Sequence, residues 1–180
     1  MQAKRFRMLL LAVLLCLALP LAAAEEAETG MLAPVSGAQE ADAQALALYC
    51  GPTQGFYRHN GQTLCTGAPY VVFGQYDCWA MAAQGTAEDF GPVGWVEAGS
   101  LSLPDGAAEL GFDDGFAAMI EEDAPVTDNP LADDPFDGWG AALPRGTQVI
   151  VLARLDGWLY VQSEVDGAPA RVFIPEESIL

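Results

Sequence analysis

The fold is decided by a stretch of sequence that occurs twice. Residues 67–81 read GAPYVVFGQYDCWAM and residues 146–160 read GTQVIVLARLDGWLY, at a constant offset of 79 residues. Trp79 aligns with Trp158 across that offset. Solenoid repeats have periods of roughly 20 to 50 residues, so the longer period here indicates a single domain that is present in two copies.

Each copy has the residue pattern of a small antiparallel sheet. Residues 70–82 and 149–161 each consist of a β-branched or aromatic run, a turn and a second apolar run. A polar loop follows, and a last apolar strand is expected at residues 94–96 and 172–174. Because no part of the chain beyond residue 24 shows a sustained helical period, we predict an all-β fold.

The repeat divides the chain into two modules. We assign residues 44–103 to the first module, 104–115 to an acidic, turn-rich linker and 116–180 to the second module. The first strands of the modules are expected at residues 46–49 and 117–120, where the apolar signal is weaker. A module of about 60 residues is marginal for a hydrophobic core of its own, so we expect the two modules to pack against each other.

The first 24 residues are typical of a secretory signal peptide. Three basic residues precede an unbroken apolar run over residues 8–19, and alanines at 22–24 provide a cleavage site. That run is shorter than the roughly 20 apolar residues of a membrane span. We therefore expect a secreted, extracytoplasmic protein with a cleaved signal, and an uncleaved anchor is the alternative. Residues 25–43 contain few large apolar side chains, which predicts a disordered leader.

The charge of the chain changes at the same boundary. All 25 acidic residues but only four of the 7 basic residues follow residue 24, which gives the processed chain a net charge of −21. Such a field repels phosphate backbones and anionic lipid surfaces. Nucleic acid and, after signal cleavage, membranes are therefore excluded as partners. Basic or neutral partners remain, although acidic charge can also serve solubility alone.

Short motifs recur in the same order in both copies. The first copy contains GAPYVV at residues 67–72 and GWV at 94–96, and the second contains GTQVIV at 146–151 and VFI at 172–174. Their order and spacing resemble those of bacterial SH3-like (SH3b) domains, with Cys78 in place of the usual glycine before the tryptophan. The resemblance covers most of both modules. It implies two small SH3-like antiparallel barrels in tandem after the signal peptide.

The resemblance also implies a non-catalytic binding protein that recognises a cell-wall peptide or another extracellular protein. Exposed aromatic side chains are enriched in binding surfaces. Tyr57, beside Arg58 and His59, lies in the irregular early part of the first module, and Trp139 lies between glycines. We expect these four residues to contact the ligand. The other tryptophans lie inside apolar strands, where we expect core packing: Trp79, Trp95 and Trp158.

Three cysteines follow the signal segment: Cys50, Cys65 and Cys78. Export to an oxidising space permits a disulfide, and we expect a bridge between Cys50 and Cys65. That bridge would close a loop of about 15 residues and stabilise the fold by roughly 3 kcal/mol in the chain-entropy model. The odd count leaves one thiol free or paired with another chain. Cys78 is expected in a hairpin turn.

The sequence carries no catalytic or metal-binding signature. A cysteine nucleophile paired with His59, the single histidine, would lack an orienting group. An EF-hand loop that started at Asp133 would place Pro135 at its third position and Pro144 at its twelfth, so the motif fails. We predict no enzyme activity, metal or cofactor. The alternatives are a structural protein that assembles through its paired modules and, less favoured, a small secreted hydrolase.

Overall fold

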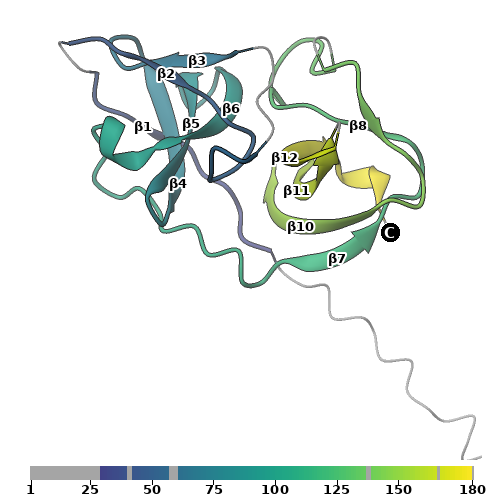
Figure 1. Cartoon of the computed structure of the whole chain (residues 1–180). Helices are drawn as coiled ribbons and strands as arrows, with labels where there is room; N and C mark the ends of the chain where they lie inside the picture. The colour runs from purple at the N-terminus through teal and green to yellow at the C-terminus, as the bar shows by residue number, and fades with distance from the viewer. Residues whose placement is uncertain (1–28, 40–41, 57–60, 137–138, 166, 180) are drawn as a thin grey trace, which may run out of the picture.

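The computed structural model describes residues 29–39, 42–56, 61–136, 139–165 and 167–179. They form an all-β molecule of four antiparallel sheets, two with four strands and two with two strands (Figure 1). The all-β prediction is therefore confirmed. Neither four-stranded sheet closes on itself in the described part of the chain, so the closed barrels expected from the sequence are not found.

The two large sheets have equivalent strand orders. The first has the order β1-β4-β5-β6, formed by β1 (Val35–Ser36), β4 (Tyr70–Tyr76), β5 (Trp79–Gly85) and β6 (Phe90–Glu97). The second has the order β7-β10-β11-β12, formed by β7 (Phe116–Met119), β10 (Gln148–Leu155), β11 (Trp158–Val165) and β12 (Ala168–Pro175). A 3₁₀ turn follows the last strand of each sheet: η1 (Ala98–Ser100) and η2 (Glu176–Ser178).

Two short strand pairs complete the modules. β2 (Ala45–Ala47) pairs with β3 (Thr63–Cys65), and β8 (Ala124–Pro125) pairs with β9 (Ala142–Leu143). The N–H of Leu48, just after β2, donates to the carbonyl of Gln62, and the N–H of Val126, just after β8, donates in the same way to the carbonyl of Ala141. The repeat that the sequence shows in its central hairpin therefore extends to the small sheets.

The central hairpins of the two modules share their irregular features. The β4–β5 ladder shifts register between Val72 and Gly74, and the β10–β11 ladder shifts between the equivalent Val151 and Ala153. Each hairpin closes with a two-residue turn whose first residue is an aspartate at positive φ, 54° at Asp77 and 39° at Asp156. Aspartate tolerates this left-handed conformation better than most residues. A bulge and a turn at the same places give both hairpins the same twist.

The disordered leader predicted for residues 25–43 is wrong over its described part. The N–H of Leu32 donates to the carbonyl of Arg154 (2.8 Å), which attaches the segment to β10 of the second sheet. Val35 and the next residue then form β1 beside β4 of the first sheet. The Leu32 side chain is buried, with 5% of its surface exposed. One large apolar residue and the free hydrogen-bonding edges of two strands order a segment whose average composition predicts disorder.

The predicted linker also packs against the body of the protein. The N–H of Gln75 donates to Ala108 (2.8 Å), and the N–H of Leu110 donates back to Gln75 (2.7 Å). Leu110 and Phe112 pack, partly buried, against the core that the two modules share. Residues 104–115 therefore form a fixed connection along β4.

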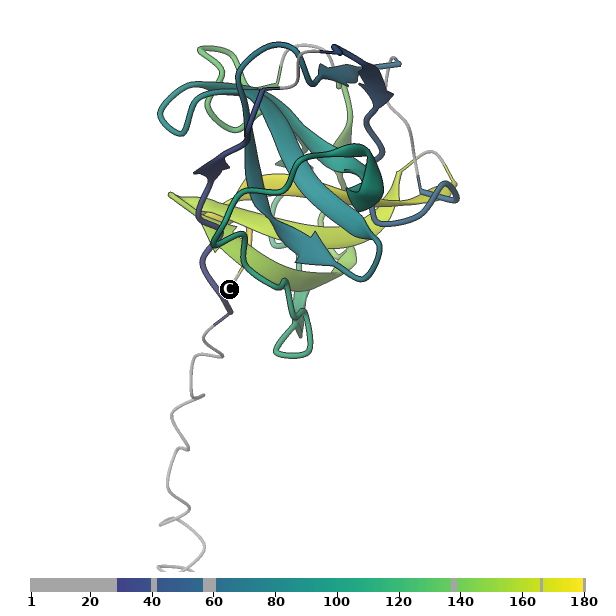
Figure 2. The same cartoon turned by 90° about the vertical axis from the view of Figure 1, so that its left-hand side faces the viewer.

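The modules pack face to face, as their small size led us to expect. One face of the first sheet covers the module's own core, which contains Leu48 and Val72. Its other face contributes Phe73 and Trp95 to a shared core that also contains Tyr160 of the second sheet. In Figure 2 the first sheet, in teal, lies across the second sheet, in yellow-green. The inner face of the second sheet covers a third core.

The contact between the modules is reciprocal. The N–H of Val93 in the first module donates to the carbonyl of Asp128 in the second (2.7 Å). The N–H of Arg171 in the second module donates to the carbonyl of Cys50 in the first (2.5 Å). Arg171 and Asp128 are 78 residues beyond Val93 and Cys50, and the same offset relates the adjacent bridges Tyr49–Trp95 and Thr127–Phe173. Equivalent residues thus make the same bond in both directions, as in the interface of a symmetric dimer.

Candidate functional site

The structure describes only part of the ligand-contact set expected from the sequence. Tyr57, Arg58 and His59 lie outside the described residues. Trp139 is half-buried and packs against the core of the second module. The tryptophans expected in cores are all placed there: Trp79 and Trp95 are buried and Trp158 packs, partly buried, against the shared core.

The described residues contain no disulfide between cysteines, so the bridge expected between Cys50 and Cys65 is not formed. Cys65 pairs with Ala45 at the start of β2, five residues before Cys50. The chain then continues away from Cys65, because the N–H of Leu48 bonds to the carbonyl of Gln62. A disulfide needs Cα atoms within about 7 Å, and extended chain rises about 3.3 Å per residue. Cys50 instead lies in the core of the second module.

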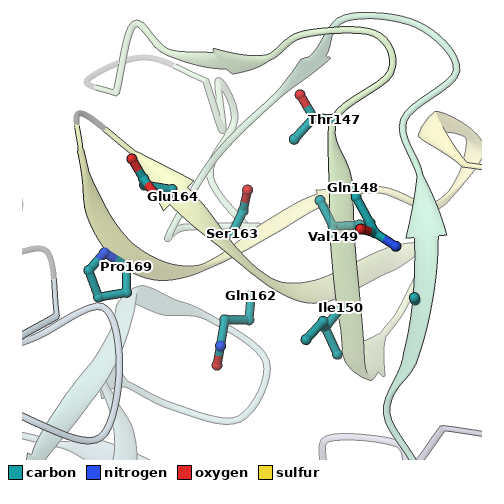
Figure 3. Close-up of a pocket in the computed structure, with 9 residues that line it drawn as sticks. Thr147, Gln148, Val149, Ile150, Gln162, Ser163, Glu164 and Pro169 are labelled. Atoms are coloured by element: carbon teal, nitrogen blue, oxygen red, sulfur yellow. The ribbon is translucent and has the colours of Figure 1, made fainter.

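The outer face of the second sheet is the one that contributes Tyr160 and Phe173 to the shared core. A shallow open hollow of about 550 Å³ lies on the part of this face that the first module leaves uncovered (Figure 3). The strands β7, β10, β11 and β12 and the turn before β10 supply its lining: Ala117, Thr147, Gln148, Val149, Ile150, Gln162, Ser163, Glu164 and Pro169. Ile150 and Gln162 face each other across the β10–β11 ladder. Glu164 is the single charged residue among the described residues that line the hollow.

The hollow exists because the shared core covers the two sheets unequally. Ile150 and Gln162 are the equivalents of Val71 and Ala83, which also face each other, across β4 and β5. Val71 and Ala83 are both 0% exposed and belong to the shared core. Ile150, in contrast, is 44% exposed. The second sheet therefore presents to solvent the positions that the first sheet buries.

Exposed apolar surface gathers beside the hollow. Ala117 pairs with Ile150 across β7 and β10, and Met119 pairs with Gln148. Met119 is 61% exposed. Single exposed apolar residues are common on protein surfaces, but neighbouring ones indicate a contact surface. An apolar group of a ligand would find a matching surface at this end of β7.

Gln162 in the hollow is hydrogen-bonded to Arg171, which is its partner across the β11–β12 ladder and lies in a cluster of aromatic rings. Nε of Arg171 donates a hydrogen bond of 3.1 Å to Oε1 of Gln162. The guanidinium carbon of Arg171 lies close to four aromatic rings, 5.6 Å from the centroid of Phe56, 5.7 Å from Tyr76, 5.6 Å from Trp95 and 4.7 Å from Phe112. The faces of aromatic rings attract a cation within about 6 Å. Within the described residues no carboxylate forms a salt bridge with Arg171.

Burial changes the ionisation of this cluster. Desolvation lowers the pKa of Arg171, and the neighbouring hydroxyls of Tyr160 and Tyr76 partly oppose that shift. Desolvation raises the pKa of the buried Tyr160 well above its usual value, while Arg171 and the hydrogen bond from Trp95 act in the opposite direction. At neutral pH the hydroxyl of Tyr160 therefore keeps its proton.

The hollow is chemically suited to binding. The described residues of its lining offer amides, hydroxyls, one carboxylate and apolar surface, and none of them is a histidine or cysteine. Across the described part of the chain, no three His, Cys, Asp or Glu residues are grouped to hold a metal ion. The described residues also include no helix with the length and apolar character of a membrane span.

No protein-family model, curated protein or solved structure matches this chain.

Proposed function

We propose that this protein is an exported, non-catalytic binding protein with two SH3-like modules, and that it binds a short cell-wall peptide in the hollow of the second sheet. The uncovered outer face around Ile150 carries the proposal, because the equivalent face of the first module is buried. The protein contains two copies of the module, and the outer face of the first copy is buried in the shared core. The outer face of the second copy is therefore the one left to bind a ligand.

The size of the hollow favours a short peptide over a protein partner. Pockets for small ligands have volumes of roughly 300 to 1,000 Å³, and the hollow has about 550 Å³. A stable protein interface buries roughly 800 Å² on each partner, which is more surface than a hollow of this size provides. The lining matches a peptide chemically, since Gln148 and Gln162 can bond to backbone amides and Ile150 can contact an apolar side chain.

The order of elements supports the SH3-like part of the proposal. In each module an early strand lies beside the central hairpin, and a polar connection, a last strand and a 3₁₀ turn follow. The sequence motifs that resemble SH3b domains fall on the hairpin and on the last strand. Export is proposed from the signal-like first 24 residues.

Cosedimentation with purified peptidoglycan tests the proposal. The chain from Glu25 onward is incubated with sacculi at low and at moderate salt, and the bound fraction is measured. Retention at both salt concentrations is expected, because a hollow with one charged residue binds through hydrogen bonds and apolar contact, which salt screens little. Absence of retention at both would overturn wall binding. In that case a stable oligomer or a protein captured by the apolar surface at Met119 would favour the assembly function.

A further inference from the structure

Gln162 is the only side chain lining the hollow for which the described structure shows a hydrogen bond to another side chain. Arginine has only donors, so the atom of Gln162 that faces Arg171 must be the amide oxygen. The two N–H groups of the Gln162 amide have no partner among the described residues. The Arg171 bond therefore fixes which end of the amide remains available to a ligand.

Arg171 is well placed to hold this orientation. Its guanidinium is packed against four rings, with the Phe112 ring nearest at 4.7 Å, and its backbone N–H bonds to the carbonyl of Cys50. The Nη1 atom is buried without a hydrogen-bond partner in the described part of the chain, and the ring faces offset part of that cost. The equivalent of Arg171 in the first module is Val93, and that of Gln162 is Ala83. The pair thus belongs to the one module whose outer face is open.

We propose that Arg171 acts as a positioning residue that aims the amide N–H groups of Gln162 into the hollow, where they donate to a carbonyl or carboxylate of the bound peptide. This assignment rests on the proposed function. Glu164 lies two residues further along the same face of β11, about 7 Å away. The hollow thus pairs a donor site with a carboxylate, which suits a peptide that carries an acceptor and an ammonium group at that separation. Ile150 lies opposite Gln162 to contact an apolar group.

A pair of variants with the same change in charge tests the role of Gln162. Gln162→Glu removes both N–H donors and gives Arg171 a carboxylate partner, so the fold is retained. Gln44→Glu adds the same charge at an exposed glutamine of the first module that does not line the hollow. The probe is the mixture of stem peptides that an amidase releases from purified peptidoglycan, and binding is measured by calorimetry. We expect Gln162→Glu to weaken binding at least tenfold and Gln44→Glu to change it less than threefold.

A second measurement separates positioning from simple stabilisation. In the wild-type chain labelled with ¹⁵N, stem peptides should shift the side-chain amide signals of Gln162. In Arg171→Met with an intact backbone spectrum, those signals should no longer respond in the same way, because the amide is free to rotate. If Arg171→Met does not fold, the Gln162→Glu comparison decides alone.

The outcomes distinguish this inference from the function on which it rests. Wild-type chain that binds neither sacculi nor stem peptides overturns both. Wild-type chain that binds, with Gln162→Glu binding equally well, overturns the role of Gln162 and leaves the proposed function standing. Binding that is lost equally in Gln44→Glu and Gln162→Glu would show that added charge, not the oriented amide, controls affinity, and it would also overturn the assignment.

Discussion

The indole nitrogen of Trp95 donates a hydrogen bond of 2.7 Å to the hydroxyl of Tyr160, and the two residues belong to different copies of the repeat. Both are buried, with exposed fractions of 0% and 2%. The Tyr160 ring also packs against Phe173, with 4.9 Å between ring centroids. Separating the modules would expose this aromatic contact and break the bond, so the two modules should unfold as one cooperative unit.

Tyr160→Phe is expected to destabilise the whole molecule. The change leaves the buried N–H of Trp95 without its acceptor, which costs about 1 to 3 kcal/mol. Denaturant unfolding followed by tryptophan fluorescence and by circular dichroism should give one coincident transition in both proteins. Tyr76→Phe, at a residue that is 39% exposed, is the control and should change the free energy of unfolding less. Two separate transitions in the wild type would contradict the shared core.

Stability should fall at alkaline pH because burial raises the pKa of Tyr160. In the unfolded chain a tyrosine loses its proton near pH 10, while the folded chain still holds it. Folding is therefore opposed above pH 10 by up to about 1.4 kcal/mol per pH unit, and it is unaffected by this group below pH 9. The free energy of unfolding, measured between pH 8 and 11, should decline more steeply in the wild type than in Tyr160→Phe. Equal slopes would show that Tyr160 titrates normally.

Leu32→Ala tests whether the segment before β1 belongs to the fold. Leu32 lies in the shared core, and removing a buried leucine side chain costs about 2 to 5 kcal/mol. Its neighbour Met31 is 66% exposed, so Met31→Ala should change stability by less than about 0.5 kcal/mol. Thermal unfolding of both variants makes the comparison. If the two substitutions have equally small effects, residues 29–39 do not stabilise the modules.

Thiol counting tests the arrangement of the cysteines. Cys78 is exposed and should react at once with a thiol reagent in the native chain, whereas Cys50 is 6% exposed and should react only on unfolding. In denaturant the chain from Glu25 onward should therefore show three thiols. A single thiol in denaturant would mean that two of the three cysteines are bridged, as the sequence had led us to expect for Cys50 and Cys65.

The sequence predicts the central hairpins well and the edges of the sheets poorly. Val149 and the apolar residues around it form a run long enough to specify β10, and Asp156 marks the turn that follows. β1 has only two residues, Val35–Ser36, and gains its structure from pairing with β4. No local pattern marks a strand of that length, because its stability comes from contacts with residues far away in the sequence.

The hollow could not be located from strand patterns alone, since Val71 and Ile150 look alike in sequence. Whether an outer face is buried depends on how the two modules pack. A comparison of the two copies does hold a signal: Gln162 and Arg171 are polar where the first module has Ala83 and Val93. Polar residues at these positions indicate that the outer face of the second sheet is less completely covered than that of the first.

The retention of two charge-matched variants on sacculi tests the central claim most directly. Ile150→Asp introduces a carboxylate into the hollow at a residue that is 44% exposed, and Leu131→Asp makes a comparable change at a residue that is 38% exposed and does not line the hollow. Because neither side chain is buried, both variants should fold. The account predicts that Ile150→Asp loses at least nine-tenths of wild-type retention and that Leu131→Asp keeps it. Equal retention of the two variants would contradict binding at the hollow.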